Sequence, residues 1–359
     1  MLPSRIKDLI SKSSNKTFLT INFGCRVNAA ETNQLSEILI SLGLTPSTNN
    51  PGIIVVNTCS VTKKGDMESR SKVNHLINQY PHATILATGC ARLEKVQDHK
   101  NLIIISNPQK ENLLQNLKGF YSSRSPDTLT HHHRFQLKVQ SGCTTFCSYC
   151  IVPYKRQKLW SLPIDDAIRT TNQALNNNFQ EIIITGINLV QYQYGFSNLV
   201  EALLTQTNTP LLSFGSIPLL CIDNKFLSLL STFPHRLSPF LHIPIQSGSD
   251  KILRLMHRPY TRKDIIYTFD QLKSTKIPNL KFGTDIIVGF PTETTHDFNQ
   301  TYNLCKSISF TKIHTFRFSP RLGTKGQTLF DQSPKISQTT KHSRSCLIRS
   351  LCSTGPHLD

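Results

Sequence analysis

The stretch Ile53-Ile-Val-Val-Asn-Thr-Cys59 decides the fold class of the first third of the sequence. Four apolar β-branched residues in a row favour a strand that is buried on both faces. The polar residues behind them mark the end of the strand, and a polar helical stretch follows at 64–79. Further apolar runs lie at 17–23, 84–87 and 102–105. Strands that alternate with helices predict an α/β domain with an open parallel sheet.

Three of these strands end directly before a cysteine, namely Cys25, Cys59 and Cys90. The carboxyl ends of parallel strands meet at one edge of a sheet, which is where ligands bind in open α/β folds. Three thiols at that edge therefore predict a metal or cluster site. The alternative is three buried structural cysteines that behave as small apolar residues.

Composition limits the class of protein and of partner. With 38% hydrophobic and 17% charged residues, the 359-residue chain is typical of a globular protein with two domains. Its formal net charge of +18 favours a polyanionic partner such as nucleic acid, although a basic surface without specific use is the alternative. Neither a secretory signal nor an apolar run of about 20 residues is visible, so we expect a cytoplasmic protein without membrane contact.

A second series of strands begins after a polar linker that contains three consecutive histidines at 131–133. About six βα units favour a partial β/α barrel of the TIM type over an open sheet, because a full eight-stranded barrel needs nearer 250 residues. The expected strands are 137–139, 181–185, 211–214, 240–245, 281–288 and 312–318. The predicted divisions are an N-terminal domain at 17–118, a linker at 119–134, the barrel at 135–325 and a short polar tail at 326–359.

The segment Cys143-Thr-Thr-Phe-Cys147-Ser-Tyr-Cys150 follows the first strand of the second series. Three thiolates on one short loop can bind three corners of a cubane iron–sulfur cluster and leave one iron open. A zinc site is the alternative, but structural zinc sites usually have a fourth ligand at a regular spacing. Only the histidines at 131–133 are candidates for that fourth ligand.

This segment resembles the signature of the radical S-adenosylmethionine superfamily, in which an aromatic residue, here Tyr149, precedes the last cysteine. The resemblance implies that the open iron of a [4Fe-4S] cluster binds S-adenosylmethionine. Reductive cleavage then gives a 5′-deoxyadenosyl radical that abstracts hydrogen from an unactivated C–H bond. The cofactors carry this step, and the protein supplies position and exclusion of water.

The chain as a whole resembles the radical methylthiotransferases, in which an N-terminal domain holds a second [4Fe-4S] cluster that donates sulfur. The resemblance implies that Cys25, Cys59 and Cys90 bind this cluster, while Cys143, Cys147 and Cys150 bind the radical-forming one. One S-adenosylmethionine supplies the methyl group and a second supplies the radical. The matching motifs are Gly24-Cys-Arg-Val-Asn28, Asn57-Thr-Cys-Ser-Val-Thr62, Thr88-Gly-Cys90, Ser141-Gly-Cys143, Ile151-Val-Pro-Tyr154, Thr185-Gly-Ile-Asn188, His242-Ile-Pro-Ile-Gln-Ser-Gly-Ser249 and Asp285-Ile-Ile-Val-Gly-Phe-Pro291.

Two loops at the ends of barrel strands are predicted to contact the nucleoside cofactor, because such loops form the active sites of β/α barrels. The alternative for both is ordinary turn chemistry, with Asp250 capping the next helix. The cofactor-binding candidates are Gly186, Asn188, Gln246, Ser247 and Ser249, together with Tyr149.

The sequence Gly24-Cys-Arg-Val-Asn28 is similar to the corresponding motif of the MtaB-like branch of the family. That branch implies methylthiolation of N6-threonylcarbamoyladenosine at C2, beside the anticodon. The implied partners are the anticodon stem-loop of tRNA and an electron donor such as flavodoxin or ferredoxin. A basic chain fits RNA, because phosphate contacts supply most of its affinity. The alternatives are another tRNA adenosine or a ribosomal protein as the substrate.

The sequence departs from the family at three places. Gln157 and Trp160 stand where a glycine and an arginine are usual, and Pro218 stands where an acidic residue is usual. The segment after Thr324 has a poor strand pattern, so the TRAM barrel that usually closes these proteins is not expected in it. These departures motivate one further alternative, a non-catalytic relative that keeps its clusters and binds RNA.

Overall fold

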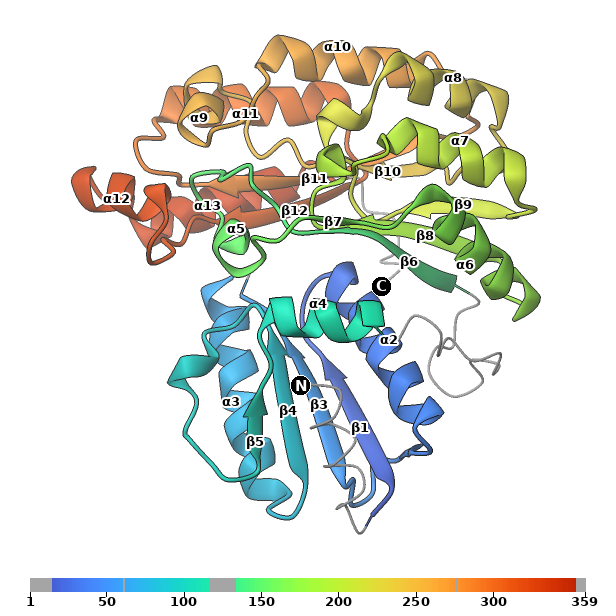
Figure 1. Cartoon of the computed structure of the whole chain (residues 1–359). Coiled ribbons are helices and arrows are strands. Elements are labelled where there is room, and N and C mark those ends of the chain that lie inside the picture. Colours follow the sequence, from blue (N-terminus) through green and yellow to red (C-terminus); the bar gives the residue numbers. More distant parts are fainter. Residues whose placement is uncertain (1–14, 61, 117–133, 276, 353–359) are drawn as a thin grey trace. The chain divides into compact units, whose positions relative to one another are not determined.

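The computed structural model describes residues 15–60, 62–116, 134–275 and 277–352 (Figure 1). The chain divides into two compact units. One comprises Met1–Thr128 together with the short segment Val152–Lys158, and the other comprises Leu129–Ile151 and Leu159–Asp359. The predicted linker at 119–134, with its histidines, lies outside the described residues except for Arg134, which begins a strand.

The first unit is built on the predicted parallel sheet, and its strand order is β2-β1-β3-β4-β5. Every residue of the central strand is buried, as the unbroken apolar run of the sequence predicts. All four strand pairings in this sheet are parallel. The strands are β1 (Thr17–Asn22), β2 (Thr45–Pro46), β3 (Ile53–Thr58), β4 (Thr84–Gly89) and β5 (Leu102–Ile104).

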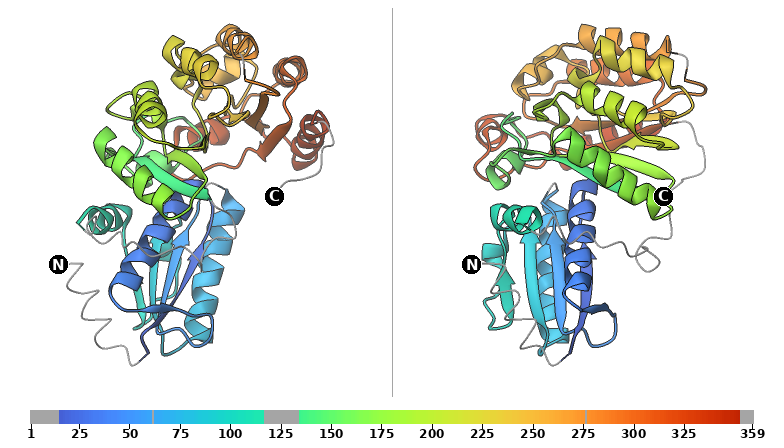
Figure 2. Two further views of the ribbon diagram at one scale, coloured as in Figure 1. Left: turned by 90° about the vertical axis from the view of Figure 1, so that its right-hand side faces the viewer. Right: turned by 45° about the vertical axis from the view of Figure 1, so that its right-hand side comes forward.

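Helices cover both faces of this sheet (Figure 2). On one face, Leu35 and Leu39 of α2 (Arg26–Ser41) and Leu113 of α4 (Asn107–Asn116) pack against alternate strand residues. On the other face, α3 (Lys63–Gln79) packs against the remaining strand residues, which alternate with those of the first face. The short helix η1 (Leu93–Lys95) follows β4. Among the described residues, helices therefore cover both faces of the sheet, and its edges are open for function.

In the described part of the second unit, six parallel strands form two sheets and follow one another in chain order, as in a partial β/α barrel. Strand β7 is the exception, because it pairs antiparallel with β6. A parallel bridge between Leu212 and Leu237 extends the pairing beyond the first sheet. The strands are β6 (Arg134–Ser141), β7 (Trp160–Ser161), β8 (Glu181–Gly186), β9 (Leu211–Phe214), β10 (Phe240–His242), β11 (Lys281–Val288) and β12 (Lys312–Arg317). The predicted α/β class and barrel are confirmed.

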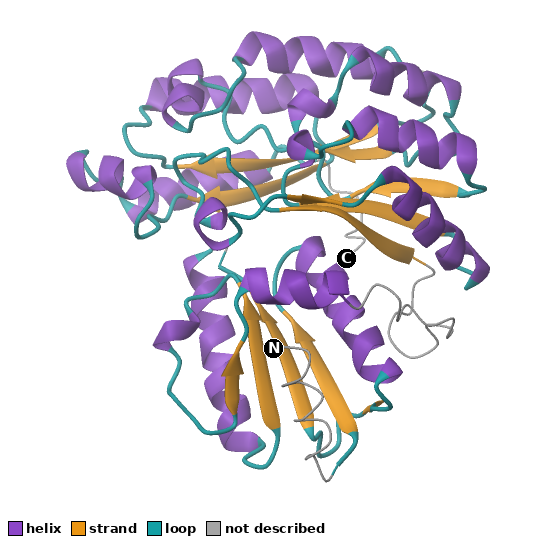
Figure 3. Cartoon of the chain, viewed as in Figure 1, coloured by secondary structure: helices purple, strands orange, loops and turns teal. Residues whose placement is uncertain are grey.

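The helices of the second unit pack on the outer face of its strands (Figure 3). Phe282, Ile286 and Val288 of β11 lie in the core beneath them. Because side chains alternate along a strand, Asp285 faces the opposite, inner side. The helices are α6 (Ile164–Asn176), η3 (Leu189–Gln191), α7 (Phe196–Gln206), η4 (Leu219–Cys221), α8 (Asn224–Thr232), α9 (Asp250–Leu255), α10 (Arg262–Lys273) and α11 (Thr295–Ile308). The short helix α5 (Val152–Lys155) belongs to the first unit.

Two more helices, α12 (Lys325–Gln332) and α13 (Gln338–Arg349), occupy the segment in which the sequence showed only a polar tail. Ile348 of α13 is fully buried in the main core of the second unit. Arg344 of the same helix forms an ion pair with Glu293, which precedes α11. Helix α13 is thus an integral part of this unit. Among the described residues, none of the helices is long and apolar enough to cross a membrane.

Candidate active site

The three cysteines of the first unit lie at the carboxyl ends of adjacent strands. Cys25 is the N-cap residue of α2, and Cys59 and Cys90 directly follow β3 and β4. Cys25 is exposed, whereas the other two are 8% exposed. Gly24 is required here because its φ is +96° and a Cβ would collide with Cys59 Sγ. Three soft thiolates at one open edge fit a cubane cluster with one free iron.

A buried charged group lies beside these cysteines, and the sequence did not predict it. Arg156, from the segment Val152–Lys158, donates from Nε to Cys90 Sγ at 3.4 Å. Its two terminal nitrogens bind the carboxylate of Glu31 at 2.6 and 2.9 Å. Lys110 Nζ lies 2.6 Å from the same carboxylate. Single arginines and lysines in polar sequence carry no pattern that would identify them as buried.

The cysteines of the second unit lie on the loop after β6. Two residues of this loop have left-handed backbones, Gly142 with φ +83° and Phe146 with φ +48°. The amide of Cys150 donates to the carbonyl of Cys147 at 2.9 Å, which closes the last turn of the loop. All three thiols are partly exposed. This donor set also fits a cubane cluster with one open iron.

The predicted cofactor loop after β8 is bonded to the cysteine loop. Asn188 donates from Nδ2 to Thr145 Oγ1 at 2.8 Å and lies 3.6 Å from Cys143 Sγ. Gln140, fully buried at the end of β6, accepts from the amide of Asn188 and donates to the carbonyl of Gly142. A Cβ at Gly186 would lie 2.8 Å from Leu189 Cδ2 and 3.0 Å from Gln140 Cβ, so glycine lets the two loops approach closely here. Hydrogen bonds therefore join the loop after β8 to the cysteine loop after β6.

The second predicted cofactor loop, Gln246–Ser249, is tied to helix α11. Gln246 has φ +68° and is 8% exposed, and its main chain bonds to β11. Ser247 Oγ lies 3.2 Å from Thr301 Oγ1. Ser249 donates to Asp297 at 2.8 Å and caps α9, so the capping role that the alternative interpretation gave to Asp250 belongs to Ser249. The two serine hydroxyls therefore bond to α11 and fix the conformation of the loop.

Arg258 is the counterpart of Arg156 in the second unit. It donates from Nη1 to Cys147 Sγ at 3.5 Å and from Nε to the hydroxyl of Tyr260 at 2.7 Å. Burial raises the pKa of the Tyr149 phenol well above its usual value, although Arg258 opposes this shift. Tyr149 therefore stays protonated, and its ring packs against the apolar cluster around Met256 and Phe290.

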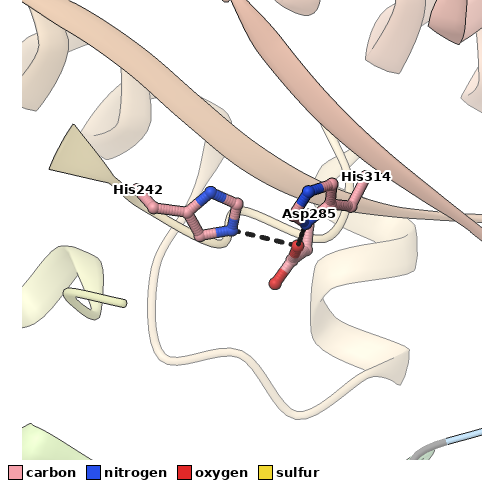
Figure 4. Close-up of side chains that lie close together, drawn as sticks. All are labelled: His242, Asp285 and His314. Carbon is pink, nitrogen blue, oxygen red and sulfur yellow. Dashed lines mark hydrogen bonds and ion pairs between the residues drawn. The ribbon is translucent and has the colours of Figure 1, made fainter. Parts of the chain in front are cut away.

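A third polar group, His242, Asp285 and His314, lies on the inner face of β10, β11 and β12 (Figure 4). Asp285 Oδ1 lies 3.0 Å from Nε2 of one imidazole and 3.2 Å from Nδ1 of the other. Burial disfavours the ionised carboxyl, but the two histidine hydrogen bonds outweigh it and lower the pKa of Asp285 to about 2. The three ligand atoms lie within 4.8 Å of one another. Both imidazoles bond to Oδ1 of the carboxylate, and these two hydrogen bonds hold the three side chains together.

Two of the positions that depart from the family pattern, Trp160 and Pro218, have ordinary structural roles. Trp160 lies in the short strand β7, and Lys138 Nζ stands 5.4 Å from the centre of its ring. Pro218 precedes η4, and its φ of −58° suits a helix start. Gln157 is exposed.

Two family profiles match the chain. The one described as "Radical SAM superfamily" matches residues 137–305, and the one described as "Uncharacterized protein family UPF0004" matches residues 17–107. The first therefore covers the cysteine loop and both cofactor loops, and the second covers the sheet that carries Cys25, Cys59 and Cys90.

Curated relatives match most of the chain. A threonylcarbamoyladenosine tRNA methylthiotransferase MtaB from Aquifex aeolicus is 30% identical, over 91% of this chain and 86% of the relative. A protein of the same name from Chlamydia pneumoniae is 31% identical, over 89% of this chain and 78% of the relative.

Among solved structures, the radical S-adenosylmethionine methyltransferase TsrM from Kitasatospora setae matches with a TM-score of 0.63. The alignment covers 87% of this chain and 77% of that chain, at 12% sequence identity. At this identity the likeness concerns the fold alone.

Proposed function

Because the chain belongs to the MtaB-like branch of the radical S-adenosylmethionine methylthiotransferases, we propose that it methylthiolates C2 of N6-threonylcarbamoyladenosine beside the anticodon of tRNA. The observation that carries the proposal is the match to the Aquifex relative, which extends over nearly the whole chain. The motif Gly24-Cys-Arg-Val-Asn28 supports the same branch.

The chain is an enzyme that transfers a methylthio group, and its cofactors are S-adenosylmethionine and two [4Fe-4S] clusters. In our proposal, Cys143, Cys147 and Cys150 hold the radical-forming cluster, and the cysteines of the first unit hold the sulfur-donating one. When bound, the reduced cluster and S-adenosylmethionine supply the radical that removes hydrogen from adenine C2. Gln140 and Asn188 orient the cysteine loop, since their hydrogen bonds fix its backbone and Cys143.

The remaining residues named for cofactor contact, Gly186, Gln246, Ser247, Ser249 and Tyr149, divide into two kinds. Gly186 and Gln246 contribute main chain at the carboxyl ends of strands, where barrel enzymes bind ligands. The two serines and Tyr149 act through packing and internal hydrogen bonds, so we propose that they position the cofactor loop.

The net charge of +18 supports the tRNA anticodon stem-loop as the partner, because RNA affinity comes largely from phosphate contacts. The same substrate supports a cytoplasmic site of action. We propose a small reduced electron carrier of the flavodoxin or ferredoxin kind as the reductant.

Mass spectrometry of tRNA nucleosides tests this function. Deleting the gene in its host should abolish 2-methylthio-N6-threonylcarbamoyladenosine and leave the unmethylthiolated nucleoside. The intact gene should restore the modification, whereas a Cys147→Ala variant should not. If the deletion leaves this nucleoside unchanged, the substrate is wrong. Loss of the methylthio group from a different adenosine would identify the alternative tRNA substrate.

A further inference from the structure

We propose that Arg156 is a positioning residue that raises the reduction potential of the cluster at Cys25, Cys59 and Cys90. The inference rests on the proposed function, which assigns a cluster to these cysteines. It concerns residues of the first unit only, because the segment Val152–Lys158 belongs to that unit.

The guanidinium of Arg156 is fixed by all three of its nitrogens. Nη1 and Nη2 form a two-pronged pair with Glu31, and Nη2 also donates to Asn28 Oδ1 at 2.9 Å. Nε then points at Cys90 Sγ, 3.4 Å away. Arg156 is 3% exposed and Glu31 is fully buried. Because the guanidinium is planar and is ordered by these bonds, its Nε–H stays directed at Cys90 Sγ. A lysine ammonium has no such fixed direction.

A second buried cation shares the same carboxylate. Lys110, 1% exposed, lies 2.6 Å from Glu31 Oε2 and donates to Asn57 Oδ1 at 3.2 Å. The three charged side chains joined by these bonds carry one net positive charge. Burial and Arg156 lower the pKa of Lys110 to about 8, although Glu31 opposes the shift. A buried cation is stable only when it is paired.

A cubane cluster held by three thiolates carries net negative charge, so it complements this buried group. Reduction adds a further negative charge to the cluster. Nearby positive charge and N–H donors to the ligand sulfurs stabilise the reduced form more than the oxidised form. Arg156 supplies both a positive charge and an N–H donor at Cys90, whereas Lys110 supplies a positive charge only. Glu31, which orients Arg156, acts in the opposite electrostatic direction.

The test measures the potential of this cluster alone. In the full chain, Cys143, Cys147 and Cys150 are replaced by alanine, which removes the radical-forming cluster, and the remaining cluster is titrated under anaerobic conditions by EPR. We expect Arg156→Gln to make reduction about tenfold less favourable, a fall of about 59 mV for one electron. Lys110→Met should lower the potential by less. Lys158→Gln, an exposed neighbour, is the matched control and should not change it.

An unchanged potential in Arg156→Gln, with about four iron per chain, would overturn the inference. If Arg156→Gln folds but does not hold the cluster, Lys110→Met decides, since a lower potential supports the proposal and an unchanged one refutes it. A higher potential in Glu31→Gln would support the electrostatic origin, because general loosening of the site would not reverse the sign. If the parent with Arg156 intact binds no iron, the proposed cluster assignment itself fails.

Discussion

At the scale of single residues, Gly24 is a position where the backbone and a neighbouring cysteine leave little freedom. Its φ of +96° and the collision of a Cβ with Cys59 Sγ both exclude alanine. We expect Gly24→Ala to reduce the iron of reconstituted protein from about eight to about four per chain. Cleavage of S-adenosylmethionine to 5′-deoxyadenosine should continue, because the other cysteine loop is unchanged, but methylthiolation should be lost.

Gly43→Ala is the matched control for this variant. Gly43 has a similar φ of +85°, but nothing lies within 4 Å of the Cβ that it would gain. The backbone strain is therefore shared, and only the collision with a cysteine differs. A similar loss of iron in both variants would show that strain, and not the approach to Cys59, is responsible.

Asp285 gives a second prediction at this scale, through its pKa of about 2. Because this value lies below the usual value near 4, the ionised carboxyl stabilises the folded chain above about pH 4 and loses this effect as pH falls toward 2. Asp285→Asn should lower the free energy of unfolding in urea by about 2–3 kcal/mol at pH 6. The difference should shrink at pH 2.5. Asp270→Asn, an exposed carboxylate on α10, is the control. An equal loss at both pH values would contradict the prediction.

At the scale of elements, helix α13 shows how much a polar segment can contribute to a core. Ile348 is fully buried, whereas its neighbour Leu347 is 50% exposed. We expect Ile348→Ala to lower the free energy of unfolding by about 2–4 kcal/mol, because it leaves a cavity in the main core. Leu347→Ala should change it by less than about 0.5 kcal/mol. Chemical denaturation of both variants makes the comparison, and equal losses would mean that α13 does not pack as described.

The strands and their cysteines could be predicted because their signals are local. The run before Cys59 is apolar and β-branched, and parallel pairing brings the ends of such strands together. Helix α13 could not be predicted, because its sequence is polar apart from Cys346, Leu347 and Ile348 and its stability comes from packing. The buried position of Arg156 could not be predicted for a related reason. Its partner Glu31 lies 125 residues away, so only the folded chain identifies the pair.

At the scale of the whole molecule, the charge of +18 predicts how tRNA binding depends on salt. Each phosphate that a lysine or arginine neutralises releases condensed counterions, so affinity falls as salt rises. With about six or more phosphate contacts, the affinity for a labelled anticodon stem-loop should fall by roughly a thousandfold between 50 and 200 mM salt. Fluorescence anisotropy with the full chain measures this loss. A fall of less than about threefold would mean that recognition does not depend on the basic surface, and the excess of lysine and arginine would need another explanation.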